Sequence, residues 1–284
     1  MHSREDSFSK GGSWVRVVPV PTPDSSRSPL ELDALTGAAG TGWAVRLLPT
    51  AESTNAVAAA DPQPDTLVVA DHQTAGRGRL DRTWDTPPGS ALTFTAVVDP
   101  GLADADWPLL PLAVALAAAD GVRSASGLPV AVKWPNDLLV PTPDGGQGKI
   151  AGILLERVSG PGGRALALIG IGINVALGPD ELPVPTASSL SIAGSPVDRT
   201  AVFAEVVPAL ATILDALRAE PGAVLERYRS ECDTVGRQVT VQLPDGETFS
   251  GTASGLDRGG RLVVDGPGGS RTIGAGDVVH VRPA

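Results

Sequence analysis

Two apolar runs joined by a glycine-rich turn restrict the possible folds of this chain more than any other feature. Residues 150–157 and 165–175 are both long enough to be strands, and the intervening GPGG sequence at 160–163 is typical of a tight reversal. We therefore expect the two runs to pair as antiparallel neighbours in one sheet. Other runs with the composition of strands lie at 43–48, 67–70, 91–97, 130–134 and 138–140.

Helices are predicted between these strands. A cap residue, a proline and an acidic residue in Ser28-Pro29-Leu30-Glu31 indicate a short helix that ends near Gly37. Later helices are expected to start with Ser53 or Thr54 as the cap, and to span 108–124, 198–218 with an interruption at Pro208, and 221–230. The predicted fold class is α+β, with a mixed, mostly antiparallel sheet and helices on one face.

The sequence pattern changes beyond Gly236. Short β-runs alternate there with Asp-Gly and Gly-Gly turns, which is typical of a small all-β barrel. At the other end, the first residues are rich in Ser, Pro, Gly and charge and are expected to be disordered. We therefore predict a tail at 1–28, a larger α+β domain at 29–233 and a small barrel domain at 234–284.

Composition narrows the class of protein. The single cysteine, Cys232, excludes an intrachain disulfide, and no apolar stretch follows the first charged residues, so the chain is expected to be cytoplasmic. The longest apolar stretch, 107–119, is shorter than the ~18 residues that a membrane helix needs. The net charge of −10 argues against general nucleic-acid binding. We expect neither a membrane nor a nucleic-acid partner, and any anion site must be local.

A basic, glycine-rich loop at 71–90 is the strongest local candidate for a site. Gly76 and Gly78 allow the backbone to approach a ligand closely, because they lack a Cβ. The loop also carries three arginines, whose planar guanidinium groups suit phosphate or carboxylate oxygens, and a tryptophan that could stack on a ring. These residues are Arg77, Arg79, Arg82 and Trp84. The pattern fits a nucleotide or anion clamp, and it also fits an ordinary solvated turn.

Lysine is scarce in this chain, and two of its three lysines lie beside further polar motifs. Arginine supplies nearly all of the positive charge, so Lys133 and Lys149 indicate positions where a compact ammonium is needed, unless they reflect codon bias alone. Lys133 precedes a turn, Pro135-Asn136-Asp137, in which Asp137 is either a functional carboxylate or a cap of the turn.

The order of the motifs is far more specific than any one of them. Along the chain they read Ser53-Thr54-Asn55, QTAGRGR at 73–79, KWPND at 133–137, GKIAGILLE at 148–156 and GIN at 172–174. From about residue 43 to 284 this succession closely resembles the biotin protein ligases. The resemblance implies a catalytic domain related to class II aminoacyl-tRNA synthetases, followed by an SH3-like domain. It also implies ATP-dependent attachment of biotin, through biotinyl-5'-AMP, to a lysine of a biotin carboxyl carrier domain of acyl-CoA carboxylases.

The resemblance also assigns roles to individual residues. Lys149 and Arg79 are the implied catalytic residues, since an ammonium can touch a carboxylate and a phosphate together. The residues implied to bind biotin are Ser53, Thr54, Asn55, Gln73, Gly76, Arg77, Gly78, Arg79 and Lys149. Those implied to bind ATP or the adenylate are Arg79, Arg82, Trp84, Lys133, Asn136, Lys149 and Asn174. Mg²⁺ is expected to bind together with the phosphates of ATP. Three roles stay open for Asp137: assisting the metal ion, positioning the incoming lysine or capping the turn.

The chain departs from the family pattern at one point and leaves rival functions to consider. Where related loops continue with any residue, glycine and arginine, this chain has Leu80-Asp81-Arg82, so the roles of these three residues stay open.

The nearest rival function is that of a lipoate or octanoate ligase, against which the KWPND and GKIAGILLE motifs count. A biotin-responsive DNA-binding repressor is disfavoured, because the residues before the catalytic domain show no recognition-helix pattern. A non-catalytic interaction protein is disfavoured by the intact Lys149 and GRGR motif.

Overall fold

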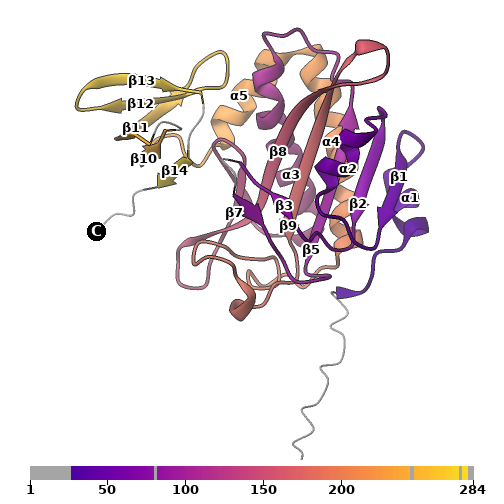
Figure 1. The fold of residues 1–284 in the computed structure, drawn as a ribbon. Helices are drawn as coiled ribbons and strands as arrows, with labels where there is room; N and C mark the ends of the chain where they lie inside the picture. Colours follow the sequence, from indigo (N-terminus) through magenta and orange to yellow (C-terminus); the bar gives the residue numbers. More distant parts are fainter. Residues whose placement is uncertain (1–26, 80–81, 244–245, 275–276, 281–284) are drawn as a thin grey trace, which may run out of the picture.

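The computed structural model describes residues 27–79, 82–243, 246–274 and 277–280 (Figure 1). Nearly all of the predicted tail therefore lies outside the described residues. The same is true of Leu80 and Asp81, where the loop departs from the family pattern.

A seven-stranded sheet forms the centre of the larger part of the molecule. Only its first pair of strands is parallel, and the rest of the sheet is antiparallel. In spatial order the strands are β1 (Ala44–Leu48), β2 (Thr66–Ala70), β5 (Ala91–Val98), β9 (Ala165–Asn174), β8 (Gln147–Ser159), β7 (Asp137–Pro141) and β6 (Ala131–Lys133). The predicted hairpin is confirmed, since β8 and β9 pair from Ala151–Ile173 to Ser159–Ala165. The predicted α+β class with a mixed sheet is also confirmed.

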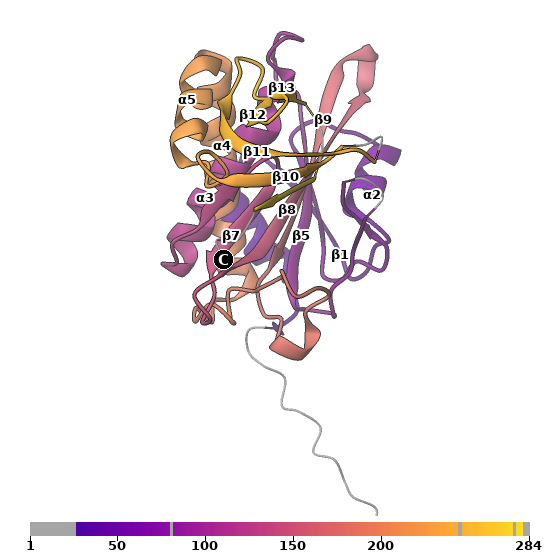
Figure 2. The ribbon, with the colours of Figure 1, turned by 90° about the vertical axis from the view of Figure 1, so that its left-hand side faces the viewer.

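Helices cover both faces of this sheet, so the prediction of one helical face was wrong. Four helices lie on one side: α1 (Leu32–Ala39), α3 (Leu110–Ser126), α4 (Arg199–Ala219) and α5 (Pro221–Glu231). On the other side α2 (Thr54–Ala60) packs against β2, β5 and β9 (Figure 2). The alternation of side chains along a strand explains this arrangement. Leu67 and Val69 of β2 join the main core, whereas Val68 joins a smaller cluster with Ala58 of α2.

Helix α4 runs without interruption through Pro208, contrary to prediction. Proline removes one backbone hydrogen bond from a helix, but Pro208 is exposed and the flanking residues Val207 and Leu210 are completely buried. The helix also lies very close to α3, because a Cβ added at Gly121 would come within 2.5 Å of the Cα of Val206. This packing stabilises the continuous helix. By length and composition alone, α4 and the segment Trp107–Ser126 could each cross a membrane, yet here they pack against each other in the core.

Helix α1 begins at Leu32, four residues later than its predicted cap Ser28. The preceding residues are held in place by tertiary hydrogen bonds. The Ser28 carbonyl accepts a hydrogen bond from the buried Arg199, and the Leu30 backbone N donates to Asp71 Oδ1. These contacts occupy the groups that would otherwise have started the helix.

The C-terminal residues form a separate five-stranded antiparallel sheet. In spatial order its strands are β13 (Gly269–Ile273), β12 (Leu262–Gly266), β11 (Thr248–Leu256), β10 (Gln238–Gln242) and β14 (Asp277–His280). The predicted β-runs are thus confirmed, whereas closure into a barrel and the domain boundary at 234 stay predictions. The sheet packs on the larger part of the protein, because Val239 and Val264 belong to the same hydrophobic core as Leu109 and Leu112 of α3 and its preceding turn.

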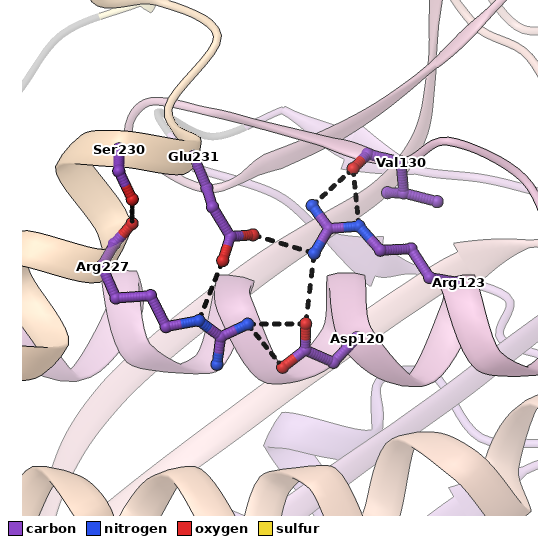
Figure 3. Close-up of polar contacts among 6 residues, drawn as sticks. All are labelled: Asp120, Arg123, Val130, Arg227, Ser230 and Glu231. Carbon is purple, nitrogen blue, oxygen red and sulfur yellow. Dashed lines mark hydrogen bonds and ion pairs between the residues drawn. The ribbon is translucent and has the colours of Figure 1, made fainter.

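An ion-pair network ties α5 to α3 (Figure 3). Arg123 donates to the Val130 carbonyl at 2.9 and 2.6 Å and also pairs with Asp120 and Glu231. Arg227 pairs with the same two carboxylates. Burial raises the pKa of Glu231, but hydrogen bonds from Arg123 and Arg227 outweigh it, so this pKa lies below its ordinary value of 4.5.

We expect the Arg123→Met variant to lower the free energy of unfolding by about 1–2 kcal/mol at pH 7, because a buried carbonyl and two carboxylates lose a charged donor. The depressed pKa of Glu231 gives stability that is present above pH 4.5 and is lost as the pH falls through the folded-state pKa. The difference in the free energy of unfolding between variant and wild type should therefore be smaller at acidic pH. Urea titrations at pH 7 and pH 4 measure it, with the exposed Arg164→Met as control. Equal stability of the Arg123 variant and wild type at pH 7 would contradict this role of the network.

Candidate active site

A pocket of about 110 Å³ lies beside α2, at the face of the sheet that the α3 layer leaves uncovered. It brings together most of the predicted site residues, which come from distant parts of the chain. Those that line it are Ser53, Thr54, Asn55, Gln73, Arg77, Gly78, Arg79, Arg82, Trp84, Asn136, Asp137 and Lys149. Thr83 and residues of β8 and β9 complete the lining: Gly152, Ile153, Leu154, Gly170, Ile171 and Gly172.

One end of the pocket is a buried polar network at the start of α2. Ser53 is the cap residue of this helix, as predicted, but its side chain makes no capping bond. Instead Gln73 Oε1 accepts hydrogen bonds from the Thr54 backbone N at 2.7 Å and from Thr54 Oγ1 at 3.0 Å. Thr95, a completely buried residue that the sequence analysis missed, lies 2.8 Å from Thr54 Oγ1 and 2.6 Å from Asn55 Oδ1. Such a fixed set of donors and acceptors suits recognition of a polar head group.

Glu156 contacts residues of this polar end without lining the pocket itself, and the sequence analysis did not single it out. Its Oε2 accepts a hydrogen bond from Asn55 Nδ2 at 2.7 Å and pairs with Arg77 at 3.3 Å. The arginine of the predicted loop is thus linked to the predicted helix start through a β8 carboxylate. The GKIAGILLE motif contains Glu156, so the motif itself carried a signal for this residue.

Glycines form the floor of the pocket, and the Trp84 ring lies directly on them. A Cβ added at Gly172 would lie 2.7 Å from Trp84, and one at Gly152 would lie 3.2 Å from it. A Cβ at Gly170 would lie 2.3 Å from Asn55 Oδ1. A side chain at Gly170 or Gly172 would therefore displace Asn55 or Trp84, and one at Gly152 would require a smaller shift. Trp84 Nε1 is buried over Gly172 and has no hydrogen-bond partner among the residues that the structure describes.

The opposite end of the pocket carries the charges. Lys149 Nζ lies 2.6 Å from Asp137 Oδ1 and 5.8 Å from the centre of the Trp84 ring. Lys149 is the third residue of β8, which begins at Gln147 rather than at the predicted Ile150. Asn136 orients its amide by donating to the Ile153 carbonyl at 2.8 Å, and its Oδ1 accepts from Arg79 at 3.3 Å. Two cations and a polar amide thus converge where an anionic ligand would be stabilised.

Three predicted residues do not line this pocket. Gly76 lines a neighbouring cavity of about 650 Å³ between the arginine loop and the C-terminal sheet. Lys133 lies behind Asp137, with 3.7 Å between its Nζ and Asp137 Oδ2. Asn174 is buried and donates to the Ser188 carbonyl at 2.9 Å. Because the Ser188 backbone N donates to the Lys149 carbonyl, Asn174 supports the segment beside Lys149.

Comparison with known proteins identifies the class of enzyme to which this fold and this pocket belong. Residues 47–174 match the Biotin/lipoate A/B protein ligase family, and residues 234–281 match the Biotin protein ligase C terminal domain. The chain is 35% identical to the biotin–[acetyl-CoA-carboxylase] ligase of Mycobacterium tuberculosis over 276 residues, which cover 91% of this chain and 98% of the relative. The chain belongs to the biotin protein ligase family and is an enzyme of the ligase class.

Further relatives agree with this assignment. The bifunctional ligase/repressor BirA of Bacillus subtilis is 32% identical over 75% of this chain and 65% of its own length. The structure resembles the biotin protein ligase of Aquifex aeolicus in complex with biotin and ATP, with a TM-score of 0.69, 25% identity and coverage of 84% of this chain and 99% of that one. It also resembles the Leishmania major ligase in complex with biotinyl-5-AMP, with a TM-score of 0.53, 26% identity and coverage of 81% and 98%.

Proposed function

We propose that this enzyme activates biotin with ATP to biotinyl-5'-AMP and transfers the biotinyl group to a lysine of a biotin carboxyl carrier domain of acyl-CoA carboxylases. The observation that carries the proposal is the pocket itself. It joins a buried polar network at one end to Lys149, Asn136 and Arg79 at the other. The names of the M. tuberculosis, A. aeolicus and L. major relatives support biotin, ATP and the carboxylase substrate.

The first step joins two anions, and the charged end of the pocket suits that task. The biotin carboxylate attacks the α-phosphorus of ATP, a mixed anhydride forms and pyrophosphate leaves. Lys149 offsets the repulsion between the carboxylate and the α-phosphate, and Arg79 offsets charge on the phosphate side. Lys149 must first exchange its 2.6 Å contact with Asp137 for contacts with substrate oxygens. Lys133, 3.7 Å from Asp137, remains to balance that carboxylate.

The polar end of the pocket fits the ureido head of biotin. Thr54, Asn55 and Gln73 present fixed hydroxyl and amide groups, and Ser53 adds a hydroxyl without a capping bond. The glycine floor of β8 and β9 accommodates the Trp84 ring and Asn55, which line the pocket. We assign Arg82 and Trp84 to the adenylate, and we keep the predicted adenylate contacts of Lys133 and Asn174 as proposals.

The second step needs no protein nucleophile. The amine of the carrier lysine attacks the carbonyl of the mixed anhydride, an amide forms and AMP leaves with the anhydride oxygen. Asp137 stays a candidate for positioning this amine, because its carboxylate lines the pocket next to Lys149.

Mg²⁺ is proposed to enter with the phosphates of ATP. Within 27–79, 82–243, 246–274 and 277–280 no group of three or more His, Cys, Asp or Glu side chains is arranged to hold a metal ion. Asp137 is the carboxylate that lines the pocket, so phosphate oxygens would supply most of the ligands and Asp137 at most one of them. The SH3-like closure of the C-terminal sheet, the cytoplasmic location and the lack of nucleic-acid and membrane partners also remain predictions.

Incubation with ATP, Mg²⁺, labelled biotin and a purified carrier domain tests the proposal. We expect pyrophosphate release with biotin and ATP alone, and label on the carrier domain when it is added. A carrier domain with its target lysine changed to arginine is the matched control and should stay unlabelled. Octanoate and lipoate run in parallel, and a preference for either acid over biotin would replace the proposed function with that of the rival ligases.

A further inference from the structure

The segment beyond α5 contacts the active-site turn at Trp134, next to a backbone hydrogen bond from Asp233 N to the Val132 carbonyl. Trp134 is 2% exposed and is followed directly by Pro135, Asn136 and Asp137. Its backbone N donates to Thr234 Oγ1 at 3.0 Å, and its indole Nε1 donates to the Gly260 carbonyl at 3.0 Å. Both hydrogen-bond donors of Trp134 are therefore satisfied by residues beyond α5, not by the catalytic part of the chain. Figure 1 shows the C-terminal strands beside β7, at the edge of the large sheet.

Thr234 also contacts the last strand that the structure describes. It is completely buried, and its hydroxyl has one proton to donate. Because Oγ1 accepts from Trp134, the proton is available to His280 Nε2, which lies 3.0 Å away on β14. With the hydroxyl as donor, Nε2 is the acceptor and the ring proton lies on Nδ1; with Nε2–H as donor, Thr234 Oγ1 accepts both contacts. Nδ1 lies 3.6 Å from Asp233 Oδ2, which is beyond hydrogen-bond distance.

The charges around His280 keep it neutral. Burial and the Lys133 ammonium lower the pKa of His280 from 6.5 to about 4, and Arg237 acts in the same direction. Asp233 and Asp137 oppose this effect without overcoming it. At pH 7 the ring is therefore neutral. Two of the facing groups, Lys133 and Asp137, belong to the turn motif of the active site.

We propose that Thr234 and His280 are positioning residues for adenylate formation, which fix the Trp134–Asp137 turn from behind. The proposal rests on the proposed ligase function and assigns a role in it to the C-terminal sheet. The turn delivers Asn136, whose Oδ1 contacts Arg79, and Asp137, whose Oδ1 contacts Lys149. Both residues follow Trp134 within three positions, so a shift of its backbone N moves them. Displacement of reacting groups by about 1 Å can lower a rate by up to ~10²-fold.

Paired variants at both positions test this role. Thr234→Val removes the hydroxyl at constant size, and Thr234→Ser retains it. His280→Leu removes the polar contact to Thr234, and His280→Gln retains a neutral polar group at that position. Thr240→Val is the matched control, because Thr240 lies in the same sheet but its hydroxyl bonds only to the exposed Ser250 at 2.9 Å. Pyrophosphate release with biotin and ATP is measured at a temperature where circular dichroism shows every variant to be folded.

We expect kcat for adenylation to fall about tenfold in Thr234→Val and His280→Leu. Thr234→Ser, His280→Gln and Thr240→Val should stay within about twofold of wild type. KM for biotin should change little, since the biotin end of the pocket around Thr54 makes none of these contacts. A purely structural role would lower the amount of folded enzyme and leave the kcat of the folded fraction unchanged.

The pH profile gives a second readout. The depressed pKa of His280 means that its contribution to stability is complete above pH 6.5 and is lost as the pH falls toward 4. Wild type should therefore lose both stability and adenylation rate over this range, and His280→Gln, which has no titrating ring, should lose less of each. Equal acid sensitivity of the two proteins would contradict a role for the neutral His280 ring in holding the turn.

The possible outcomes distinguish failure of the positioning role from failure of the proposed ligase function. If wild type releases pyrophosphate with biotin and the Thr234→Val and His280→Leu variants match it in kcat, the ligase function stands and the positioning role is wrong. If Thr234→Ser is as slow as Thr234→Val, packing rather than the hydrogen bond is responsible and the proposal also fails. If wild type itself releases no pyrophosphate with biotin, the proposed function is overturned.

Discussion

The Lys149→Met variant is expected to form biotinyl-5'-AMP about 10²–10³ times more slowly than wild type while keeping its fold. Lys149 is the ammonium that reaches both the pocket and Asp137, and its side chain is 33% exposed, so it adds little to the core. Removal of Lys149 does not leave the Asp137 carboxylate without a cation, because Lys133 Nζ lies 3.7 Å from its other oxygen. The substitution should therefore lower the rate of adenylate formation and leave the free energy of unfolding nearly unchanged.

Single-turnover pyrophosphate release measures this effect, and the midpoint of thermal unfolding tests the fold. Lys149→Arg is the informative partner variant, because it keeps the charge but replaces the compact ammonium by a planar group. We expect it to lie between wild type and Lys149→Met. Arg164→Met, an exposed change far from the pocket residues in the structure, serves as the neutral control. A folded Lys149→Met enzyme with the wild-type rate would remove Lys149 from the chemistry.

The parts of the fold that the sequence predicts well are those fixed by local patterns. The hairpin of β8 and β9 follows from two apolar runs and one turn, and the C-terminal strands follow from regular turn signals. The errors came from tertiary contacts. Helix α4 continues through Pro208 because Val206 packs closely on Gly121 of α3 and Leu210 is buried in the core. Helix α1 starts late because Arg199 and Asp71 hold the residues before it. No local rule contains those partners.

The pocket shows the same division. Motif order brought together Lys149, Gln73 and the Ser53–Asn55 segment, which the structure places around one pocket. It missed Thr95, because a threonine inside an apolar strand looks like an ordinary β-former until Thr54 and Asn55 are placed beside it. The glycines of β9 were closer to being predictable, since positions 170 and 172 share one face of a strand.

These glycines support the second large prediction, that Gly172→Ala weakens biotin binding about 10- to 100-fold. The added Cβ would lie 2.7 Å from the Trp84 ring, which is too close for a carbon contact, so the ring must shift into the space left for the ligand. Overpacking of this kind costs about 1–3 kcal/mol, which corresponds to roughly 5- to 150-fold in affinity. The fold should survive, since alanine is better tolerated than glycine inside a strand.

Calorimetric titration with biotin tests this prediction, with Gly255→Ala as the matched control because nothing lies within 4 Å of a Cβ at that strand position. A double-mutant cycle then identifies the cause. In the Trp84→Ala background the ring that the new Cβ would meet is gone, so Gly172→Ala should cost much less than it does in wild type. If the cost is the same with and without Trp84, the methyl group acts on the ligand directly and the ring is not the element that the glycine floor accommodates. If Gly172→Ala binds biotin as tightly as wild type, the floor of β8 and β9 is not part of the biotin site.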